Sequence, residues 1–587
     1  MARIVLAACN AQYIHSNLAV YNLKAFAGSY GDQVLLREYT INQNKDEILR
    51  DLYKAQPSVI CFSCYIWNIS FVEELLGDLG KILPDVSLWT GGPEVSFRPE
   101  EFLEKNPCVT GVMTGEGEET FLELTAFYQG EGKGALEAIR GIVFRAGNGQ
   151  IQRTPARTAL NLDCVPFAYE ALESSACADS TDLGMNGKRD WDALISNRII
   201  YYESSRGCPF SCSYCLSSVD KRLRFRSLEL VQRELQFFLD HRVPQVKFVD
   251  RTFNCNHAHA MAIWKYIKEH DNGVTNFHFE IAADLVSEEE LSCMEGMRPG
   301  LIQLEIGVQS TNPYTIREIR RKMDFERVSY IVRRIHAMGN IHQHLDLIAG
   351  LPFEDLESFK RSFQDVYALR PHQLQLGFLK VLRGSYMYEM AEEYGCVYQT
   401  KEPYEVLSTR WLSYEDILLL KSVESMVEAY YNSGQFDNTL ALLEPYFDTF
   451  FSLYERLGAF YEKRQYDVIS HSRMRRYEIL LEFAQEEGIA PLDKLREKMI
   501  FDLYLRENLK KRPEWAPDQK MWDKEIWSFR RKNKISKTAH IEVFADGRMV
   551  LFDYDKRSPL THNAQVQELG RFTEGGLCAQ GSVERFT

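Results

Sequence analysis

Three cysteines stand close together in the stretch ESSRGCPFSCSYCLSS, residues 203–218. Cys208, Cys212 and Cys215 follow the spacing C-x3-C-x2-C, and no nearby Cys or His cleanly supplies the fourth ligand that a zinc site requires. Thiolates hold iron–sulfur clusters, and cubane clusters usually take four of them. Three ligands leave one iron open to a small molecule. We therefore expect a 4Fe-4S cluster at this loop.

Strand and helix patterns alternate around the cysteine loop. The apolar strand IIYYE (199–203) leads into the loop, and further strand patterns follow it, separated by helical ones. Residues 196–400 together hold six such strands, which predicts an α/β fold of the partial (β/α)6, TIM-like barrel type. The chemistry of these barrels lies at the carboxyl ends of the strands, which is where the cysteines stand.

A second alternation occupies residues 1–150 and predicts a Rossmann-like domain, with a parallel sheet covered by helices on both faces. Ligands of such sheets bind beyond the carboxyl ends of the strands. Polar or Gly-rich loops fall at these ends, with the sequences NAQYIHSN, SCYIWNIS, GGPEVSF and TGEGEETF. Residues 151–195 lack strong periodicity, and we expect a linker there.

Residues 401–587 predict a helix-rich C-terminal domain with many aromatic side chains. The stretch HIEVFADGRMVLFDY predicts a small β-hairpin that turns at Asp546-Gly547. The last residues, 570–587, are expected to be poorly ordered. Elsewhere, Cys61 and Cys64 form a C-x2-C pair inside the apolar run VICFSCY, so we expect buried core thiols rather than a metal site.

The composition excludes some classes of protein. The chain has 587 residues and a formal net charge of -14, which argues against a general nucleic-acid binder with a basic face. No apolar run reaches the roughly 18 residues of a membrane span. The opening MARIVLAACNAQYIH reads as a strand and a polar loop rather than a secretory signal. With 13 cysteines, we expect a protein of the reducing cytoplasm.

The C-x3-C-x2-C motif, with Tyr214 before its last cysteine and after the first barrel strand, resembles that of the radical S-adenosylmethionine (SAM) superfamily. In that superfamily the open iron chelates the amine and carboxylate of SAM. One electron then cleaves SAM to methionine and a 5′-deoxyadenosyl radical. The resemblance covers residues 196 to about 385 and implies the same cofactors here.

Later segments extend the resemblance to the residues that hold SAM. VDRTFN, 249–254, stands at the loop after the second strand, although it departs from the Gly-rich form of many members. LEIGVQSTNPYTIREIRRK and LDLIAGLPFED are similar to the coproporphyrinogen-dehydrogenase-like group. The resemblance implies SAM contacts from Tyr214, Asp250, Arg251, Glu280, Gln309, Arg321 and Asp346. Arg206 and Arg224, beside the cluster loop, are candidates to meet an anionic cofactor or substrate.

The loops GGPEVSF (91–97) and TGEGEETFLEL (114–124), upstream of such a barrel, resemble those of the cobalamin-binding radical SAM enzymes. The resemblance implies cobalamin contacts from Ser63, Gly91, Gly92, Pro93, Glu94, Gly115, Glu116, Gly117 and Glu118. One departure is that the Asp-x-His-x-x-Gly motif, whose His ligates cobalt, is missing, and His15 lacks that frame. We expect cobalt without this ligand. In the alternatives, His15 is a polar contact, or the domain is vestigial.

The resemblance implies an enzyme that cleaves SAM reductively and methylates an unactivated carbon of an unknown small-molecule or peptide substrate. A one-electron donor such as flavodoxin or ferredoxin is implied as its partner. One alternative keeps both cofactors but catalyses a non-methylating rearrangement or cyclisation. Others are a methylthiotransferase, which the acidic balance disfavours, and a non-catalytic cobalamin sensor. The C-terminal region resembles an unassigned domain found at the end of some cobalamin-dependent radical enzymes.

Overall fold

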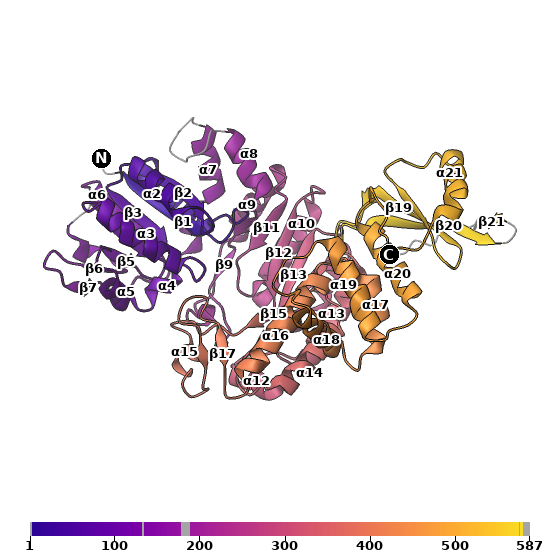
Figure 1. Ribbon diagram of the computed structural model, residues 1–587. Coiled ribbons are helices and arrows are strands. Elements are labelled where there is room, and N and C mark those ends of the chain that lie inside the picture. Colours follow the sequence, from indigo (N-terminus) through magenta and orange to yellow (C-terminus); the bar gives the residue numbers. More distant parts are fainter. Residues whose placement is uncertain (1–2, 132–133, 178–187, 574–575, 579–587) are drawn as a thin grey trace.

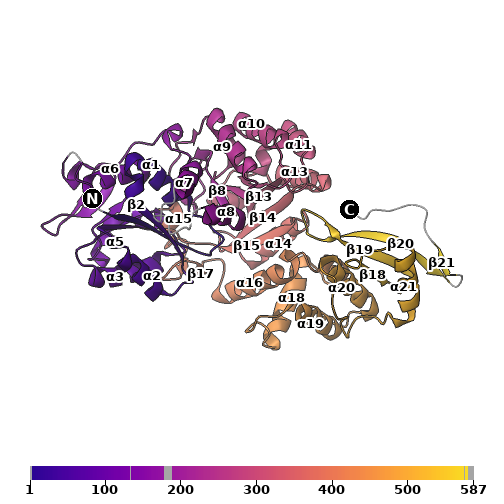
Figure 2. The same ribbon diagram turned by 90° about the horizontal axis from the view of Figure 1, so that it is seen from above.

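The computed structural model describes residues 3–131, 134–177, 188–573 and 576–578 (Figure 1). An N-terminal α/β domain, a barrel of parallel strands, a group of helices and an antiparallel sheet follow one another along the molecule. The antiparallel sheet lies at the end opposite to the N-terminal domain in both views (Figures 1 and 2). None of the helices in these residue ranges is long and apolar enough to cross a membrane.

The N-terminal sheet has the strand order β2-β1-β3-β4-β5-β6-β7. The first five strands in this order are parallel, and β6 and β7 continue the sheet in antiparallel pairing. The order 2-1-3-4-5 is that of a doubly wound sheet, so the expected Rossmann-like fold is confirmed. The strands are β1 (Ile4–Asn10), β2 (Val34–Thr40), β3 (Val59–Ser63), β4 (Ser87–Gly91), β5 (Gly111–Met113), β6 (Ile142–Arg145) and β7 (Ile151–Arg153).

Helices cover both faces of this sheet because successive residues of a strand point to opposite sides. Leu6 packs in the same apolar cluster as Val20 of α1 and Phe121 of α6. Its neighbour Val5 packs with Ile48 of α2 and with residues of α3 and α5. The helices are α1 (Leu18–Phe26), α2 (Lys45–Lys54), α3 (Ile69–Ile82), α4 (Pro93–Ser96), α5 (Pro99–Lys105) and α6 (Glu118–Tyr128).

Six parallel strands form the barrel in the order β15-β14-β13-β12-β11-β8, which confirms the predicted partial (β/α)6 barrel. The strands are β8 (Ile200–Tyr202), β11 (Gln245–Phe248), β12 (Asn276–Ile281), β13 (Ile302–Gln309), β14 (His342–Ala349) and β15 (Gln373–Phe378). The helices that follow them are α9 (Leu228–Asp240), α10 (His257–Glu269), α11 (Glu288–Glu295), α12 (Pro313–Glu318), α13 (Phe325–Met338) and α14 (Leu356–Tyr367).

Other parts of the chain cover the two edges of this open barrel. At the β8 edge, His15 bridges to Ile199, and the Ser16 hydroxyl donates to the Ile199 carbonyl at 2.8 Å. At the β15 edge, the Leu374 N–H donates to Asn432 Oδ1 at 2.8 Å, and Asn432 Nδ2 donates to the Leu374 carbonyl at 2.9 Å. An uncovered edge strand would leave such groups unpaired, so the N- and C-terminal regions both complete the barrel.

The segment 151–195, expected to be a linker, contains regular structure. Ile151–Arg153 is the last strand of the N-terminal sheet, and α7 (Ala168–Cys177) packs against α1. The Tyr169 hydroxyl donates to the Tyr201 carbonyl of β8 at 2.8 Å. Helix α8 (Lys188–Asn197) then leads into the barrel. This segment therefore links the two domains along the chain and also packs against both of them.

The C-terminal region is helix-rich, as expected, and ends in a sheet that is larger than the predicted hairpin. Gly547, at φ +80°, makes the predicted turn between β18 and β19. Two further antiparallel strands, β20 and β21, extend the sheet. Residues 570–573 and 576–578, expected to be poorly ordered, thus lie in strands, whereas 574–575 and 579–587 lie outside the described residues.

The helices and strands of this region are α16 (Tyr414–Met426), α17 (Asp437–Leu443), α18 (Phe450–Lys463), α19 (Arg473–Glu486), α20 (Leu492–Arg506), α21 (Asp523–Lys532), β18 (His540–Val543), β19 (Arg548–Arg557), β20 (Ala564–Thr573) and β21 (Gly576–Cys578). Short elements around the barrel mouth are β9 (Ser205–Arg206), β10 (Arg224–Phe225), α15 (Tyr386–Glu389), β16 (Val397–Tyr398) and β17 (Val406–Ser408).

Candidate active site at the mouth of the barrel

The three cysteines lie in a loop whose ends are held together by the antiparallel pair β9 and β10. Cys208 and Cys212 are buried, and Cys215 is partly exposed. Burial raises the pKa of Cys208, and the nearby thiols of Cys215 and Cys212 raise it further, although hydrogen bonds with the Phe210 backbone and the Thr252 side chain lower it in part. At Gly207, φ is +96°, and a Cβ atom would lie 2.6 Å from the Arg222 carbonyl oxygen, so the loop requires glycine. This gathering of thiols fits an iron–sulfur cluster.

Arg321 links the cluster loop to the end of β13. Its guanidinium donates to the Gly307 carbonyl, to the Tyr214 hydroxyl at 3.3 Å, and towards Cys212 Sγ at 3.8 Å. The Nε atom of Arg321 is buried and has no hydrogen-bond partner among the described residues. The guanidinium thus stands beside the cysteines with donor capacity left, as expected for the cation that pairs with the SAM carboxylate.

Acceptor groups gather at the carboxyl ends of neighbouring strands. Gln309 adopts φ +74°, and its Oε1 atom is buried without a partner in the described chain. Burial raises the pKa of Glu280, at the end of β12, to about 7. Burial likewise raises the pKa of Asp346 on β14. The structure therefore places Gln309 and Glu280 near the carboxyl ends of their strands and Asp346 in the middle of β14.

Asp250, which is predicted to contact SAM, is held by hydrogen bonds inside the protein. It is fully buried, and its carboxylate accepts hydrogen bonds from the Ser204 N–H at 3.0 Å, the Ser204 hydroxyl at 2.7 Å and the Ser205 hydroxyl at 2.5 Å. Because both carboxylate oxygens are engaged inside the protein, Asp250 fixes the strand end that precedes the cluster loop. The exposed Arg251 lies near enough to Glu280 to offset part of the rise in its pKa.

The glycines of the N-terminal loops differ in the space that their surroundings would leave for a side chain. At Gly92, φ is +113°, and a Cβ atom would lie 2.4 Å from the Cys64 carbonyl oxygen. At Gly117 a Cβ atom would meet Leu23 at 3.1 Å, and at Gly91 it would make an ordinary contact with Met113. Gly115, at φ +72°, would meet nothing within 4 Å. Packing within the domain therefore accounts for Gly92, and Gly115 alone of the four borders open space.

Glu116 and Glu118, which are predicted to contact cobalamin, form ion pairs with the barrel domain. Arg206 Nη2 lies 2.7 Å from Glu118 Oε1 and 2.8 Å from Glu203 Oε2. Arg224 Nη2 lies 2.5 Å from Glu116 Oε1. The two arginines, which we considered for an anionic cofactor or substrate, are thus neutralised by these carboxylates. The ion pairs tie the start of α6 directly to the strands that flank the cluster loop.

The loop that carries Pro93 and Glu94 is covered by the chain beyond the barrel. Pro93 occupies the first turn of α4. The Tyr404 hydroxyl donates to Glu94 Oε2 at 3.1 Å, and burial raises the pKa of Glu94. Glu402 accepts from the Ser70 N–H at 2.9 Å and from the Ser70 hydroxyl at 2.6 Å. The GGPE loop is therefore held between the two domains.

Polar atoms and aromatic rings at the carboxyl ends of β3 and β4 fit a flat ligand. Ser63 Oγ and Thr90 Oγ1 are buried without hydrogen-bond partners in the described residues. The rings of Tyr65 and Trp67 stack 4.4 Å apart, and Trp67 is 41% exposed. Trp67 is not among the contacts that the sequence predicted. Its signal would have been a large aromatic residue in the polar loop that follows β3.

His15 contacts the barrel, since its Nδ1 atom lies 2.8 Å from the Tyr201 hydroxyl. Burial lowers the pKa of His15, and so does the charge of Lys247. This geometry agrees with the alternative in which His15 is a polar contact. Cys61 and Cys64 are fully buried, and burial raises the pKa of Cys61 to about 12, so their assignment as core thiols is confirmed.

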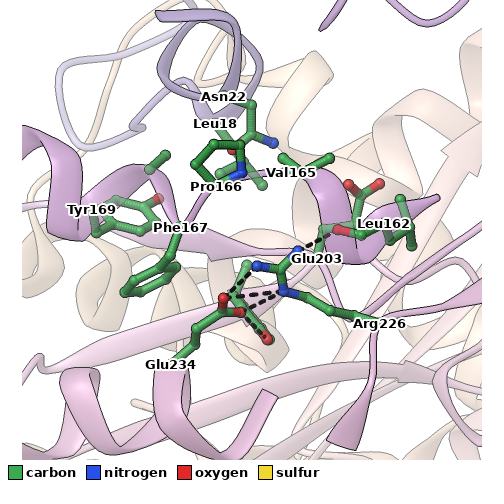
Figure 3. Close-up of a pocket in the computed structure, with 12 residues that line it drawn as sticks. Leu18, Asn22, Leu162, Val165, Pro166, Phe167, Tyr169, Glu203, Arg226 and Glu234 are labelled. Atoms are coloured by element: carbon green, nitrogen blue, oxygen red, sulfur yellow. Dashed lines mark hydrogen bonds and ion pairs between the residues drawn. The ribbon is translucent and has the colours of Figure 1, made fainter. Parts of the chain in front are cut away.

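A small cavity that no cysteine lines lies between α1, the segment 162–169 and α9 (Figure 3). The buried ion pair of Arg226 and Glu234, with Nη2 and Oε1 2.5 Å apart, spans one side of it. The Arg226 guanidinium also donates to the Leu162 carbonyl. Because these groups satisfy one another, the cavity is a junction between domains rather than the candidate site.

Comparisons with known protein families agree with this arrangement. Residues 4–125 match the B12 binding domain, and residues 202–366 match the radical SAM superfamily. Residues 392–551 match a family of unknown function, DUF4080. The chain is therefore a radical SAM protein with an N-terminal B12-binding domain. It is homologous to cobalamin-dependent radical SAM methyltransferases and carries a C-terminal domain of unassigned function.

Curated relatives include two kinds of enzyme. The cobalamin-dependent radical SAM methyltransferase TokK of Streptomyces tokunonensis is 28% identical over 52% of this chain and 44% of its own length. The anaerobic magnesium-protoporphyrin IX monomethyl ester cyclase of Rubrivivax gelatinosus is 21% identical over 58% of this chain and 59% of its own. The chain thus spans about half the length of these relatives.

Solved structures share the fold at low identity. OxsB, described as a cobalamin-dependent SAM radical enzyme with aqua-cobalamin and SAM bound, superposes with a TM-score of 0.58 and 15% identity, covering 91% of this chain and 82% of its own. The SAM methyltransferase TsrM from Kitasatospora setae gives a TM-score of 0.54 and 17% identity, covering 68% and 78%. At such low identity, these similarities show a shared fold and nothing further.

Proposed function

We propose that the chain is a cobalamin-dependent radical SAM methyltransferase, which cleaves SAM at a 4Fe-4S cluster and methylates an unactivated carbon. The observation that carries the proposal is the junction of the two domains. The loop of Cys208, Cys212 and Cys215 adjoins, through the ion pair of Arg206 and Glu118, the edge of the B12-binding domain where its parallel strands have their carboxyl ends. A substrate carbon between the two would be reached from both sides.

The residues of the chain have separate tasks in this proposal. The three thiolates hold the cluster, and Arg321 pairs with the SAM carboxylate. Glu280 accepts from the SAM amine, while Gln309 and Asp346 meet the ribose hydroxyls. Ser63 and Gly115 border the cobalamin. When bound, the cluster supplies the electron that cleaves SAM, and cobalamin carries the methyl group to the substrate.

The proposal is tested by incubating the reconstituted, reduced protein with small-molecule extract and SAM that carries a CD3 methyl group. We expect a product that gains one CD3 group in place of hydrogen, detected by mass spectrometry. A variant with all three cluster cysteines changed to Ala is the matched control and yields no such product. Formation of 5′-deoxyadenosine with a product of unchanged carbon count would contradict methyl transfer.

That last outcome would support a second candidate, a cobalamin-dependent radical SAM cyclase. Its support is the similarity to the magnesium-protoporphyrin ester cyclase over more than half of this chain. The same domains serve both reactions, so the mass of the product separates them. In either case we propose a cytoplasmic enzyme that receives electrons from a flavodoxin or ferredoxin, because the cluster cysteines require reducing surroundings.

A further inference from the structure

A second cavity, of about 320 Å³, lies in the segment that follows the last barrel strand. The elements α15 and β17 of this segment lie beside the N-terminal domain in both views (Figures 1 and 2). Pockets that hold small molecules begin at about 300 Å³, so this cavity is large enough for a small organic ligand. Its lining residues are Val381, Arg383, Tyr388, Tyr398, Thr400 and Tyr404.

The lining combines apolar ring surfaces with polar groups and one cation. A tyrosine side chain has a flat apolar body and a hydroxyl at its end. Among the residues that the structure describes, the hydroxyls of Tyr388 and Tyr398 and the guanidinium of Arg383 have no hydrogen-bond or ion-pair partner. None of the described lining residues is acidic. The polar groups of the cavity are therefore available to a ligand that brings acceptor atoms.

Arg383 is held on one face and open on its edge. Its guanidinium carbon lies over the Tyr404 ring, 5.6 Å from the ring centroid, and this contact limits the positions of the side chain. Tyr404 is fixed in turn, because its hydroxyl donates to Glu94 Oε2 at 3.1 Å. A guanidinium held in this way keeps its N–H edge for a carboxylate or a phosphate group, which it binds through two parallel hydrogen bonds.

A second guanidinium adds positive charge beside the cavity. Arg98 of the N-terminal domain lies over the Tyr388 ring, 5.0 Å from its centroid. Burial and the neighbouring Tyr388 raise the pKa of Tyr398, whereas the charges of Arg383 and Arg98 lower it in part, so both cations lie near the Tyr398 hydroxyl. Arg98 is already paired with Glu101 at 3.0 Å. Arg383 is therefore the cation that is left for a ligand.

We propose that this cavity binds a small organic anion. Its carboxylate or phosphate group would pair with Arg383 and accept a hydrogen bond from Tyr398, while an aromatic or other flat apolar body lies against the tyrosine rings. Tyr398, Thr400 and Tyr404 fall within residues 392–551, which match the family of unknown function. The proposal therefore gives the beginning of this C-terminal domain a ligand-binding role.

The segment that forms the cavity is bonded both to the cysteine loop and to the GGPE loop. The Met387 N–H donates to the carbonyl of Ser213, which stands between two of the cluster cysteines, at 2.8 Å. On the other side, Tyr404 holds Glu94, and a Cβ atom at Gly384 would lie 2.3 Å from the Phe97 ring. A bound anion would therefore lie beside the boundary of the two domains. Its binding does not depend on the proposed methyl transfer.

The test is a fluorine-19 NMR titration of the full-length, cluster-reconstituted protein with 4-fluorobenzoate and with 4-fluorophenyl phosphate. Excess SAM and cobalamin are present, so that the probes do not occupy the sites proposed for these cofactors. We expect a dissociation constant of about 1 mM or lower for at least one probe, and much weaker binding of the neutral 4-fluorobenzyl alcohol. Arg383→Gln should weaken anion binding about tenfold or more. The matched control is Arg410→Gln, at an exposed arginine that does not line the cavity, which leaves the affinity unchanged.

A reversal of charge keeps the test free of folding effects. Arg383→Glu should bind the cation 4-fluorobenzylammonium more tightly than the wild-type chain does, and a gain of affinity cannot come from misfolding. The anionic probe that the wild-type chain binds more tightly tells whether the ligand is a carboxylate or a phosphate ester, and either result supports the proposal. Binding of neither anion, or binding that Arg383→Gln leaves intact, would overturn it. A preference for anions that persists in Arg383→Glu would also contradict it.

Discussion

Arg321 is the residue on which the contacts at the barrel mouth converge. It joins the end of β13 to Tyr214 and Cys212, while its buried Nε atom has no hydrogen-bond partner among the residues that the structure describes. A planar fork of donors can hold these groups and a carboxylate at once, which a lysine ammonium cannot. Because of this geometry, a conservative replacement of Arg321 is the most informative test of how the barrel mouth holds SAM.

We predict that Arg321→Lys lowers the rate of SAM cleavage roughly tenfold to a hundredfold, because the fork is lost although the charge is kept. The measurement is 5′-deoxyadenosine formed by the reduced protein, with iron and sulfide content determined in parallel. Arg320→Lys, at the neighbouring position, is the control and should leave the rate unchanged. An unaltered rate in Arg321→Lys would show that the guanidinium does not hold SAM.

Glu280 gives a prediction about pH. Burial raises its pKa from 4.5 to about 7 in the folded chain. A carboxyl whose folded pKa is raised contributes stability that is complete below pH ~4.5 and is lost as the pH rises towards 7. Glu280→Gln stays neutral, so it escapes this loss. Its unfolding free energy relative to wild type should rise by roughly 2–3 kcal/mol between about pH 5 and pH 8.

Denaturant unfolding of both chains at several pH values, without cofactors, measures this difference. Other buried acids also titrate in this range, such as Asp502, whose pKa burial raises to about 7. They titrate in wild type and variant alike, so the difference between the two chains isolates Glu280. A difference that stays constant from pH 5 to pH 8 would contradict the raised pKa.

At the residue scale, the sequence predicts well where the chemistry depends on neighbours in the chain. The three thiols fall within eight residues, so their spacing alone indicates a cluster. The ion pair of Glu118 was harder to predict, because its partner Arg206 lies 88 residues away in the sequence. Because Glu118 stands in a Gly-rich loop, the sequence suggested a ligand contact. Long-range ion pairs of this kind leave no local pattern in a sequence.

At the scale of elements, the ion pairs between the start of α6 and the strands β9 and β10 fix the cluster loop against the B12-binding domain. We predict that Arg206→Met lowers the unfolding free energy by about 3 kcal/mol, because it leaves the buried Glu118 and the half-buried Glu203 without their cation. Chemical denaturation of the full chain measures the change.

The matched control for this prediction is Arg222→Met, in the same loop. Its partner Asp220 is partly exposed, and such a surface pair contributes little. Arg222→Met should therefore unfold at nearly the wild-type denaturant concentration. Equal effects of the two substitutions would mean that the pairs between the domains add no more than ordinary surface charges.

Asn432 completes the open edge of the barrel with two hydrogen bonds to the backbone of Leu374. We predict that Asn432→Ala destabilises the chain by roughly 2 kcal/mol and promotes aggregation, since it exposes an unpaired edge strand. Asn508→Ala, which removes one exposed hydrogen bond to Thr538, is the control. Light scattering and denaturation would record both effects. If the two variants behaved alike, covering the barrel edge would not be a role of the C-terminal domain.

Helices and strands with a strong hydrophobic periodicity were predictable from the sequence. Strands that depend on pairing with a distant segment were less predictable. The alternation of apolar strands and amphipathic helices predicted both parallel sheets in the observed class. The C-terminal sheet was underestimated because β20 finds its partner in β19 through an irregular register, with shifts at Met549 and Asp553. The structure of the segment 151–195 arises from packing against α1 and β8, which its own weak periodicity did not reveal.

At the scale of the whole molecule, the domains share one core. A single apolar cluster runs from Leu6 in the N-terminal sheet, through Phe238 and Leu345 around the barrel, to Tyr454 in the C-terminal helices. The B12-binding loops and the cysteine loop are therefore held at a fixed boundary rather than by a flexible tether. This continuity supports the proposal that the two sites act on one substrate.

The most direct test of this account is the yield of 5′-deoxyadenosine and S-adenosylhomocysteine from the anaerobically reconstituted protein, supplied with cobalamin, SAM and a strong one-electron reductant. The account predicts both products from the wild-type chain and no 5′-deoxyadenosine from the Cys208→Ala, Cys212→Ala, Cys215→Ala triple variant. A wild-type chain with a fully formed cluster that yields neither product would contradict it and favour a non-catalytic cobalamin sensor.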